Sequence, residues 1–306
     1  MNKISILYVS YNSLDLIENS ISSLLPFLNG ISHEILVWEN GSKSILYSSE
    51  NSRFQFYSGN ENYGYGYGLN RLAEKAKGNI LLIINPDTKI IKFDINKTVQ
   101  LFDNTEIGVI GIQHLNVDSE IVSSTRSFPR LRYLFLDMFL FSSIFRKSEI
   151  FGRQFMFHKS HQVSFFPEVV VGSLMLLRTN DFKFIKGFDE RFFMYCEETD
   201  LCRRLFQLGK RAYFYADSIL IHDEGGATPN LKFNVINNYV SLNLYSRVHF
   251  SKLKSNLFVF MNLLNKLTRG FLYIVFGIIS FDKNFIKKGI LFLSVGFRNP
   301  FKYFKI

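Results

Sequence analysis

The chain has 306 residues, a hydrophobic fraction of 47% and a net charge of +10. This length and apolar content predict a buried core and exclude an intrinsically disordered chain. Phenylalanine (34) and tyrosine (15) are frequent, which favours either membrane contact or ring-stacking sites. Composition alone does not separate these two.

The excess positive charge lies at one end of the chain. From Ser246 onward there are 11 lysines and arginines and one acid, Asp282, whereas the first 245 residues carry 25 basic and 25 acidic side chains. We therefore expect two parts, a neutral globular body (1–245) and a basic, apolar helical tail (246–306). An anionic membrane surface suits such a tail better than nucleic acid does, so no nucleic-acid partner is expected.

The two cysteines, Cys196 and Cys202, form no CxxC pair or disulfide-like framework, which favours a reducing compartment. The apolar run at residues 4–9 is too short for a signal peptide, and no small-residue cleavage site follows it. We expect the protein to be cytoplasmic.

Short apolar runs alternate with helical patterns along the body. Ser13 is the expected N-cap of a helix over residues 13–28, and a second helix is expected over 69–76. The predicted strands are 3–9, 34–38, 54–57, 80–84, 107–112, 169–177 and 212–215. Alternating elements with nearly continuous apolar strands predict an α/β fold whose parallel sheet is covered on both faces.

Polar turns follow three of these strands, at residues 10–12, 39–42 and 85–88. Because ligands bind at the carboxyl ends of such strands, these polar groups are expected to converge. Residues 123–167 are irregular and too long for a connecting loop. They are interpreted as a lid, an acceptor-binding insert or a second membrane contact, and the sequence does not decide among the three.

Residues 187–205 contain the acidic residues that are the main candidates for catalysis. Glu197, Glu198 and Asp200 begin a predicted helix directly after an aromatic run, and the helix N-terminus and the neighbouring charges act on these carboxylates in opposite directions. A general base needs such a tunable proton affinity. The structural alternative is a charged first helical turn in which Asp200 pairs with Arg204 at i,i+4.

Glycine alternates with tyrosine from Gly64 to Gly68. The pattern is GxGxG rather than GxGxxG and does not follow the first strand, which disfavours a nucleotide-sugar oxidoreductase. The glycines are interpreted as allowing the backbone to approach a ligand, with Asn62 and Asn70 as hydrogen-bonding neighbours. The alternative is a flexible tyrosine-rich loop.

The tail contains two apolar runs, 257–264 and 271–281, separated by Lys266 and Arg269. Neither reaches the ~20 residues that a membrane span requires. We expect the tail to lie on a membrane surface with its lysines toward anionic headgroups, and the protein to sediment with membranes. The alternative is a pair of helices packed on the body or in a dimer interface.

Several motifs taken together in order resemble an inverting glycosyltransferase of family 2, in its bacterial rhamnosyltransferase-like branch. The resemblance runs from about residue 4 to 228, and its first half comprises Ser10-Tyr11-Asn12, the turn 39–42, the stretch 61–70 and Asn-Pro-Asp-Thr at 85–88. Its second half comprises 171–178, 187–204 and His222 followed by Gly225-Gly226. One departure is Glu39, where the family commonly has Asp, and this bears on the identity of the nucleotide.

The resemblance implies a GT-A Rossmann-like fold with a mainly parallel central sheet, followed here by the amphipathic helical tail. It implies Glu198 as general base, with Asp200 in reserve, and a divalent cation, Mg²⁺ or Mn²⁺, at Asp87 and His222. The alternative for Asp87 is a capped turn, and the alternative for His222 is a structural histidine whose hydrogen bonds are satisfied within the protein. The implied residues for nucleotide-sugar binding are Ser10, Tyr11, Asn12, Glu39, Asn62, Gly64, Asn70 and Asn85.

The expected activity is therefore a single displacement that moves a sugar, with rhamnose as the candidate, from a nucleoside diphosphate. The acceptor would be a lipid-linked oligosaccharide or a polysaccharide at the inner face of the cell membrane, and a homo-oligomer is an open possibility. The alternative from another class is a catalytically silent protein that binds nucleotide sugar or scaffolds polysaccharide assembly.

Overall fold

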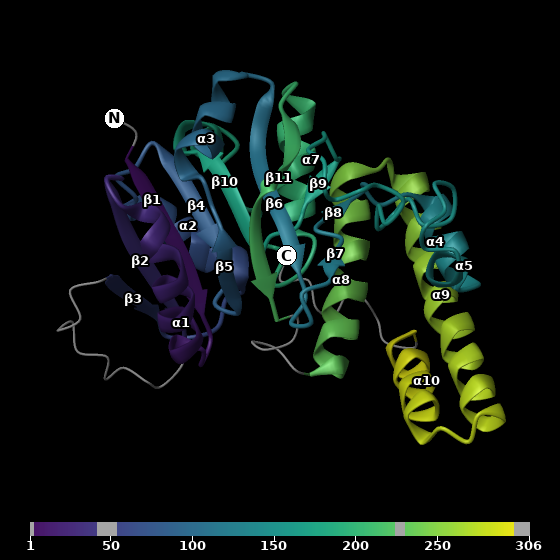
Figure 1. The fold of residues 1–306 in the computed structure, drawn as a ribbon. Coiled ribbons are helices and arrows are strands. Elements are labelled where there is room, and N and C mark those ends of the chain that lie inside the picture. Colours follow the sequence, from purple (N-terminus) through teal and green to yellow (C-terminus); the bar gives the residue numbers. More distant parts are fainter. Residues whose placement is uncertain (1–2, 42–53, 224–229, 297–306) are drawn as a thin grey trace. The chain divides into compact units, whose positions relative to one another are not determined.

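The computed structural model describes residues 3–41, 54–223 and 230–296, and they divide into two compact units (Figure 1). The first unit takes the described residues within Met1–Arg126, Ser160–Phe193 and Glu197–Pro229. The second takes Ser127–Lys159, Met194–Cys196 and the described residues within Asn230–Ile306.

The first unit is built on a mixed sheet in the order β3-β2-β1-β4-β10-β6-β11-β5, with β7 paired to β6. Neighbours are parallel through β3, β2, β1 and β4 and again between β6 and β11, whereas β10 and β5 run antiparallel to their neighbours. The strands are β1 (Ile4–Ser10), β2 (His33–Asn40), β3 (Gln55–Gly59), β4 (Ile80–Ile84), β5 (Thr88–Lys92), β6 (Ile107–Leu115), β7 (Ile121–Val122), β10 (Leu174–Arg178) and β11 (Arg211–His222). The prediction of a mostly parallel α/β sheet is confirmed.

The central strands are buried on both faces because helices cover the sheet. Every residue of β1 and β4 is buried, which explains why both strands read as continuous apolar runs rather than as alternating patterns. The helices of this unit are α1 (Leu14–Leu24), α2 (Tyr65–Lys75), α3 (Ile95–Gln100), α6 (Thr179–Phe184) and α7 (Glu197–Gln207), with 3-10 turns at Leu25–Leu28 and Leu101–Asp103.

Three local expectations change in the structure. Ser13 precedes α1, but its hydroxyl makes no capping hydrogen bond. Helix α2 begins at Tyr65, so the glycine–tyrosine run is helical rather than a flexible loop. The expected strand at 169–177 is two strands, β9 (Val169–Val170) and β10, of which β9 pairs with β8 (Thr125–Arg126) in a separate ribbon.

The second unit is helical. It contains α4 (Leu131–Met138), α5 (Phe141–Ile144), α8 (Leu231–His249), α9 (Lys252–Ile279) and α10 (Lys283–Gly296). The expected boundary at residue 245 falls inside α8, and the first apolar run of the tail and the second run as far as Ile279 belong to one continuous helix, α9. Among the helices of the described residues, none is long and apolar enough to cross a membrane.

Candidate active site

Asp87 and His222 meet at one edge of the sheet. Asp87 lies in the turn between β4 and β5, and His222 is the last residue of β11. The Oδ1 atom of Asp87 is 3.3 Å from Nε2 of His222, and both side chains are nearly buried. Within the described part of the chain, this Oδ1 and the Nδ1 of His222 have no hydrogen-bond partner. A buried carboxylate oxygen that has no hydrogen-bond partner and lies beside an imidazole is suited to binding a cation.

A second histidine, His114 on β6, contacts the ring of His222. Its ring is edge-on to that of His222, with centroids 5.8 Å apart, and its Nε2 is 3.2 Å from the hydroxyl of Ser173. Burial, and then the neighbouring His222, hold the pKa of His114 well below its usual value. A neutral ring supports His222 without adding positive charge.

Tyr65, at the start of α2, connects the Asp87 turn with the glutamates of α7. Its hydroxyl donates to Asn85 Oδ1 at 2.7 Å and contacts the carbonyl of Gly172 at 3.3 Å. Burial raises the pKa of Tyr65 well above its usual value, and the charges of Glu197, Asp87 and Glu198 raise it further. The tyrosine hydroxyl is therefore within electrostatic reach of all three carboxylates.

Glu197 and Glu198 occupy the first turn of α7, as the sequence predicts. Burial raises the pKa of both carboxyls, and that of Glu197 is raised further by the charge of Glu198. Glu197 is 7% exposed, whereas Glu198 is only partly buried. Hydrogen bonds from its own N-terminal turn, including the Thr199 hydroxyl at 3.0 Å, and the charge of Arg126 act to lower the Glu198 pKa. Glu198 thus combines a raised proton affinity with access to solvent.

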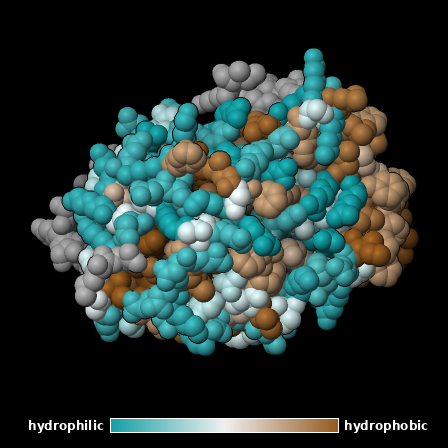
Figure 2. Space-filling model, turned by 90° about the horizontal axis from the view of Figure 1, so that it is seen from above, coloured by the Kyte–Doolittle hydropathy of each residue, from teal (hydrophilic) through white to brown (hydrophobic). Residues whose placement is uncertain are grey.

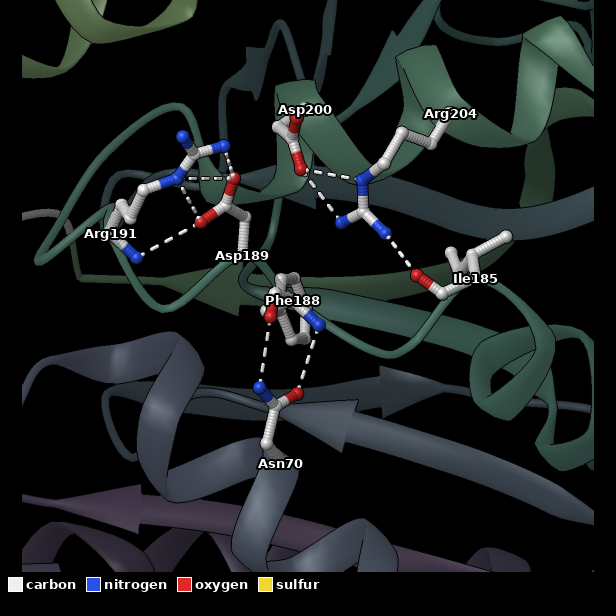
Figure 3. Close-up of polar contacts among 7 residues, drawn as sticks. All are labelled: Asn70, Ile185, Phe188, Asp189, Arg191, Asp200 and Arg204. Carbon is white, nitrogen blue, oxygen red and sulfur yellow. Dashed lines mark hydrogen bonds and ion pairs between the residues drawn. The ribbon is translucent and has the colours of Figure 1, made fainter. Parts of the chain in front are cut away.

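Asp200 has a different environment (Figure 3). It is fully buried, and its Oδ2 accepts from Arg204 Nε at 2.8 Å and lies 2.7 Å from Arg204 Nη2. Arg204 in turn donates from Nη1 to the carbonyl of Ile185 at 2.6 Å. This is the i,i+4 pairing that the sequence offered as the structural alternative, so Asp200 holds α7 to the loop before it.

Asn70 also has a structural role (Figure 3). Its Oδ1 accepts from the Phe188 amide, and its Nδ2 donates to the Phe188 carbonyl and to Glu190, each at 2.9 Å. Next along the loop, Arg191 makes a two-pronged contact with Asp189, at 2.9 Å from Nε and 2.6 Å from Nη2. Asn70 was expected at the donor, but its amide fixes the loop that leads toward α7.

The residues expected on the donor side gather at the ends of β1 and β2. Glu39 is buried, and its Oε1 accepts from the backbone amide of Asn12 at 3.2 Å. Its Oε2 is buried without a partner among the described residues. Ser10 is buried with its hydroxyl 3.2 Å from that of Ser13, whereas Tyr11 is 53% exposed.

Asn40 and Asn62 join these strand ends to the glycine run. Asn40 Nδ2 donates to the Gly64 carbonyl at 2.9 Å, and Asn62 Oδ1 accepts from the Gly64 amide at 3.0 Å. Gly64 has a φ of +101°, and a Cβ there would collide with the carbonyl oxygen of Phe193. A glycine is required here because two backbone segments of the protein meet, and the expectation that it lets the backbone approach a ligand stays a prediction.

A family model matches this chain over residues 5–164, slightly more than half of its length, and its description is "Glycosyl transferase family 2". The chain belongs to glycosyl transferase family 2. The predicted family is thereby confirmed.

Two relatives are similar to this chain over part of their length. The low-salt glycan biosynthesis hexosyltransferase Agl10 of Haloferax volcanii is 27% identical over 213 residues, which cover 67% of this chain and 62% of that protein. The rhamnosyltransferase WbbL of Escherichia coli K12 is 47% identical over 51 residues, 17% of this chain and 19% of that protein. The chain thus spans less than two thirds of the relatives it matches.

Solved glycosyltransferases share the fold. A Pyrobaculum calidifontis mannosyltransferase in complex with GDP-Man and Mn²⁺ superimposes with a TM-score of 0.55 at 13% identity, covering 96% of this chain and 85% of that one. Staphylococcus aureus TarS 1–349 gives 0.51 at 14% identity, with coverage of 96% and 82%. GalNAc-T7 with UDP, GalNAc and Mn²⁺ gives 0.52 at 15% identity, with coverage of 81% and 51%. The GT-A fold expected from the motifs is confirmed.

The family 2 motifs contain Tyr65 and Ser173 without assigning them a role, and two further contributors, His114 and Arg126, lie outside the motifs. From the sequence, the glycines around Tyr65 are interpreted as allowing the backbone to approach a ligand, although the position of the tyrosine between two glycines at a helix start was a usable signal. His114 lies near the end of β6, beyond the strand predicted over 107–112. Arg126 carried no local signal, because only the pairing of β8 with β9 places it near α7.

Proposed function

We propose that this family 2 member is an inverting glycosyltransferase that moves a sugar from a nucleoside diphosphate to an acceptor hydroxyl in one displacement. The observation that carries the proposal is the placement of Tyr65 among Asp87, Glu197 and Glu198. The Tyr65 hydroxyl, which is partly buried, is within electrostatic reach both of Asp87, which lies beside His222, and of Glu198, a carboxylate of raised proton affinity. Leaving-group stabilisation and deprotonation of the acceptor require those two kinds of group close together.

Glu198 is the proposed general base. It is the glutamate of the pair that solvent, and hence an acceptor, reaches. Its raised pKa lets it take a proton from a hydroxyl at neutral pH, while Arg126 and Thr199 favour its ionised form beforehand. Asp200 is not carried forward as a base because Arg204 already engages its carboxylate.

Asp87 and His222 are the proposed ligands of a divalent cation, Mg²⁺ or Mn²⁺. The fit rests on the unpartnered Oδ1 of Asp87 facing the Nε2 of His222. No group of three His, Cys, Asp or Glu side chains suited to a metal occurs in the described residues, so the remaining positions would belong to donor phosphates and water. When bound, such a cation neutralises charge on the departing diphosphate.

The proposed donor lies along the ends of β1 and β2. The Oε2 atom of Glu39 has no partner among the described residues and can accept a hydrogen bond from a ribose hydroxyl or a base. The Asn12 backbone amide, which donates to Oε1, orients the carboxylate. Rhamnose is the candidate sugar because of the short match to a rhamnosyltransferase. A lipid-linked oligosaccharide or a polysaccharide is the proposed acceptor, in keeping with a relative named for glycan biosynthesis.

The test is a panel of nucleoside-diphosphate sugars incubated with the full chain and Mg²⁺ or Mn²⁺, followed by release of nucleoside diphosphate. We expect metal-dependent turnover of one donor, loss of that turnover with a chelator, and an inverted anomeric configuration by NMR when an acceptor is supplied. Donor binding without any turnover would favour a catalytically silent scaffold, and retention of configuration would refute the single displacement.

A further inference from the structure

Helix α9 of the second unit is polar on the side that packs against its neighbours. Ser255, Asn262, Asn265 and Lys266 are all buried, although such residues usually face water on a surface helix. They recur at helical spacing and therefore lie on one side of α9. This inward side contacts α4, α8 and α10.

Hydrogen bonds and an ion pair satisfy part of this inward side. Asn262 Nδ2 donates to Asn243 Oδ1 on α8 at 2.9 Å. On α4, the carbonyl of Leu134 and the carboxylate of Asp137 accept from Asn265, each at 3.2 Å. Arg269 is paired with the same Asp137. Helix α4 of the 127–159 segment therefore supplies hydrogen-bond acceptors to the polar side of α9.

The opposite side of α9 carries exposed apolar side chains. We define the α9 stripe as Leu253, Leu257, Phe260, Phe271 and Ile278, which are 47–82% exposed. Their spacing of three, four or seven residues, with one longer step, keeps them on one helical face, and the stripe is about 38 Å long at 1.5 Å per residue. The inward side also buries Phe258 and Tyr273, so what distinguishes α9 from a water-facing helix is that buried amides and a lysine lie opposite a stripe of exposed leucine and phenylalanine.

Small residues bring α9 and α10 close together. Gly270 lies against Leu293 and the backbone of Gly289, and Gly277 lies against Ile286, so that a Cβ at either glycine would collide. Small residues between helices with polar groups as additional contacts are the packing pattern of helices in lipid, where apolar side chains gain nothing by facing inward.

The positive charge of the second unit favours an anionic surface as the partner of the α9 stripe. The described residues of the second unit contain 15 lysines and arginines and three acids, and one of those acids, Asp137, is buried against Arg269. Exposed lysines lie at both ends of the stripe, with Lys252 and Lys254 on either side of Leu253, and Lys283 and Lys287 after Ile278. Two copies of so basic a unit would repel each other, whereas an anionic bilayer attracts it.

We propose that the α9 stripe lies in the headgroup–acyl boundary of an anionic membrane, with the flanking lysines on its lipid phosphates. This refines the expectation from the sequence in two ways. Lys266 and Arg269, which separate the two apolar runs of the sequence, point inward rather than toward headgroups, and burial lowers the pKa of Lys266 to about 8. The lipid contact comes instead from one continuous apolar face. Figure 2 shows brown and tan residues gathered over helices of this unit at the right of the view.

The experiment is sedimentation of the full chain with vesicles of phosphatidylcholine mixed with phosphatidylglycerol. We expect the Phe260→Ser, Phe271→Ser double variant to bind at least about tenfold more weakly, since each ring loses burial in lipid. The matched control is Phe184→Ser with Phe206→Ser, two first-unit rings of similar exposure, 73% and 49%, and it should bind like wild type. Pure phosphatidylcholine vesicles and high salt should both weaken binding of the wild type.

A second measurement covers the case in which the serine variant is poorly folded. Phe271→Trp keeps the stripe apolar, and its emission should shift to the blue when anionic vesicles are added. Unchanged vesicle binding by a folded stripe variant, or no emission shift, would overturn the proposal. So would a stripe variant that turns a dimer into a monomer with no vesicle binding in either form, because the stripe would then belong to a second copy. Turnover of donor does not enter these readouts, so the lipid proposal and the proposed reaction can fail separately.

Discussion

Asp87 Oδ1 lies 3.3 Å from His222 Nε2 because strand β5 follows Asp87 directly and pairs antiparallel with β11. The register of that pairing places Thr88 opposite His222. Two polar residues far apart in sequence are thus held together by backbone hydrogen bonds rather than by flexible side chains. A rigid pair of this kind is suited to presenting ligands to a cation.

Replacing either member of the pair should remove metal dependence. In Asp87→Asn and His222→Ala, we expect metal-dependent turnover to fall about a hundredfold or more, because each substitution removes a ligand. Titration of turnover with Mn²⁺ measures this. His33→Gln, an exposed histidine of the first unit, serves as control and should titrate like wild type.

Glu198→Gln should lower turnover by about 10²- to 10⁴-fold with donor affinity retained, as is typical when a general base is lost. In the wild type, turnover should rise with pH through the raised pKa of Glu198, because the base acts in its ionised form. A pH profile of initial rates on both proteins measures the effect. Near-normal turnover by the folded variant would mean that another group takes the proton.

Glu197 should make the fold less stable as pH rises. Burial and then the charge of Glu198 raise its pKa in the folded state above the ordinary 4.5, so its favourable contribution is complete below pH 4.5 and is lost as pH rises through the raised value. Glu197→Gln stays neutral, and we expect it to be more stable than wild type at neutral pH. Urea unfolding across the pH range tests this, and identical pH dependence of the two proteins would contradict it.

Asp200→Asn should cost about 3 kcal/mol of unfolding free energy or more, because it leaves Arg204 partly buried without its partner charge. The exposed pair of Lys97 and Asp217 offers a contrast, since Asp217→Asn should change stability by less than about 1 kcal/mol. Chemical denaturation of both variants gives the comparison. Equal small losses would show that the buried pair has no special role in holding α7.

Tyr65→Phe should reduce both stability and turnover. It leaves the part-buried Asn85 Oδ1 without its 2.7 Å donor, at a cost of about 0.5–1.5 kcal/mol, and it removes the link between the Asp87 turn and the Gly172 carbonyl. Thermal unfolding and kcat measure the two effects. A variant with wild-type kcat would restrict Tyr65 to a structural role.

The sequence by itself determined the family, the fold class and the motif positions. Continuous apolar runs identify β1 and β4 as buried strands because both of their faces are covered. Local sequence also predicted α7 and its three acids, since helix starts depend on nearby residues. It offered both a base role and an ion pair for Asp200, because i,i+4 spacing permits a pair without requiring one.

Only the tertiary structure decided which of these groups meet and which sides of the helices face outward. Strand β5 is only five residues long, and its two adjacent isoleucines lie between polar residues without an alternating pattern, so the pairing that joins Asp87 to His222 could not be predicted from local sequence. Asn70 and Gly64 proved to contact the protein's own backbone at Phe188 and Phe193, which are distant in sequence. The α9 stripe is likewise a tertiary property. Composition showed that the tail is basic and apolar, but the packing of α4, α8 and α10 determines that Asn262 and Asn265 lie inside while Phe260 and Phe271 lie outside.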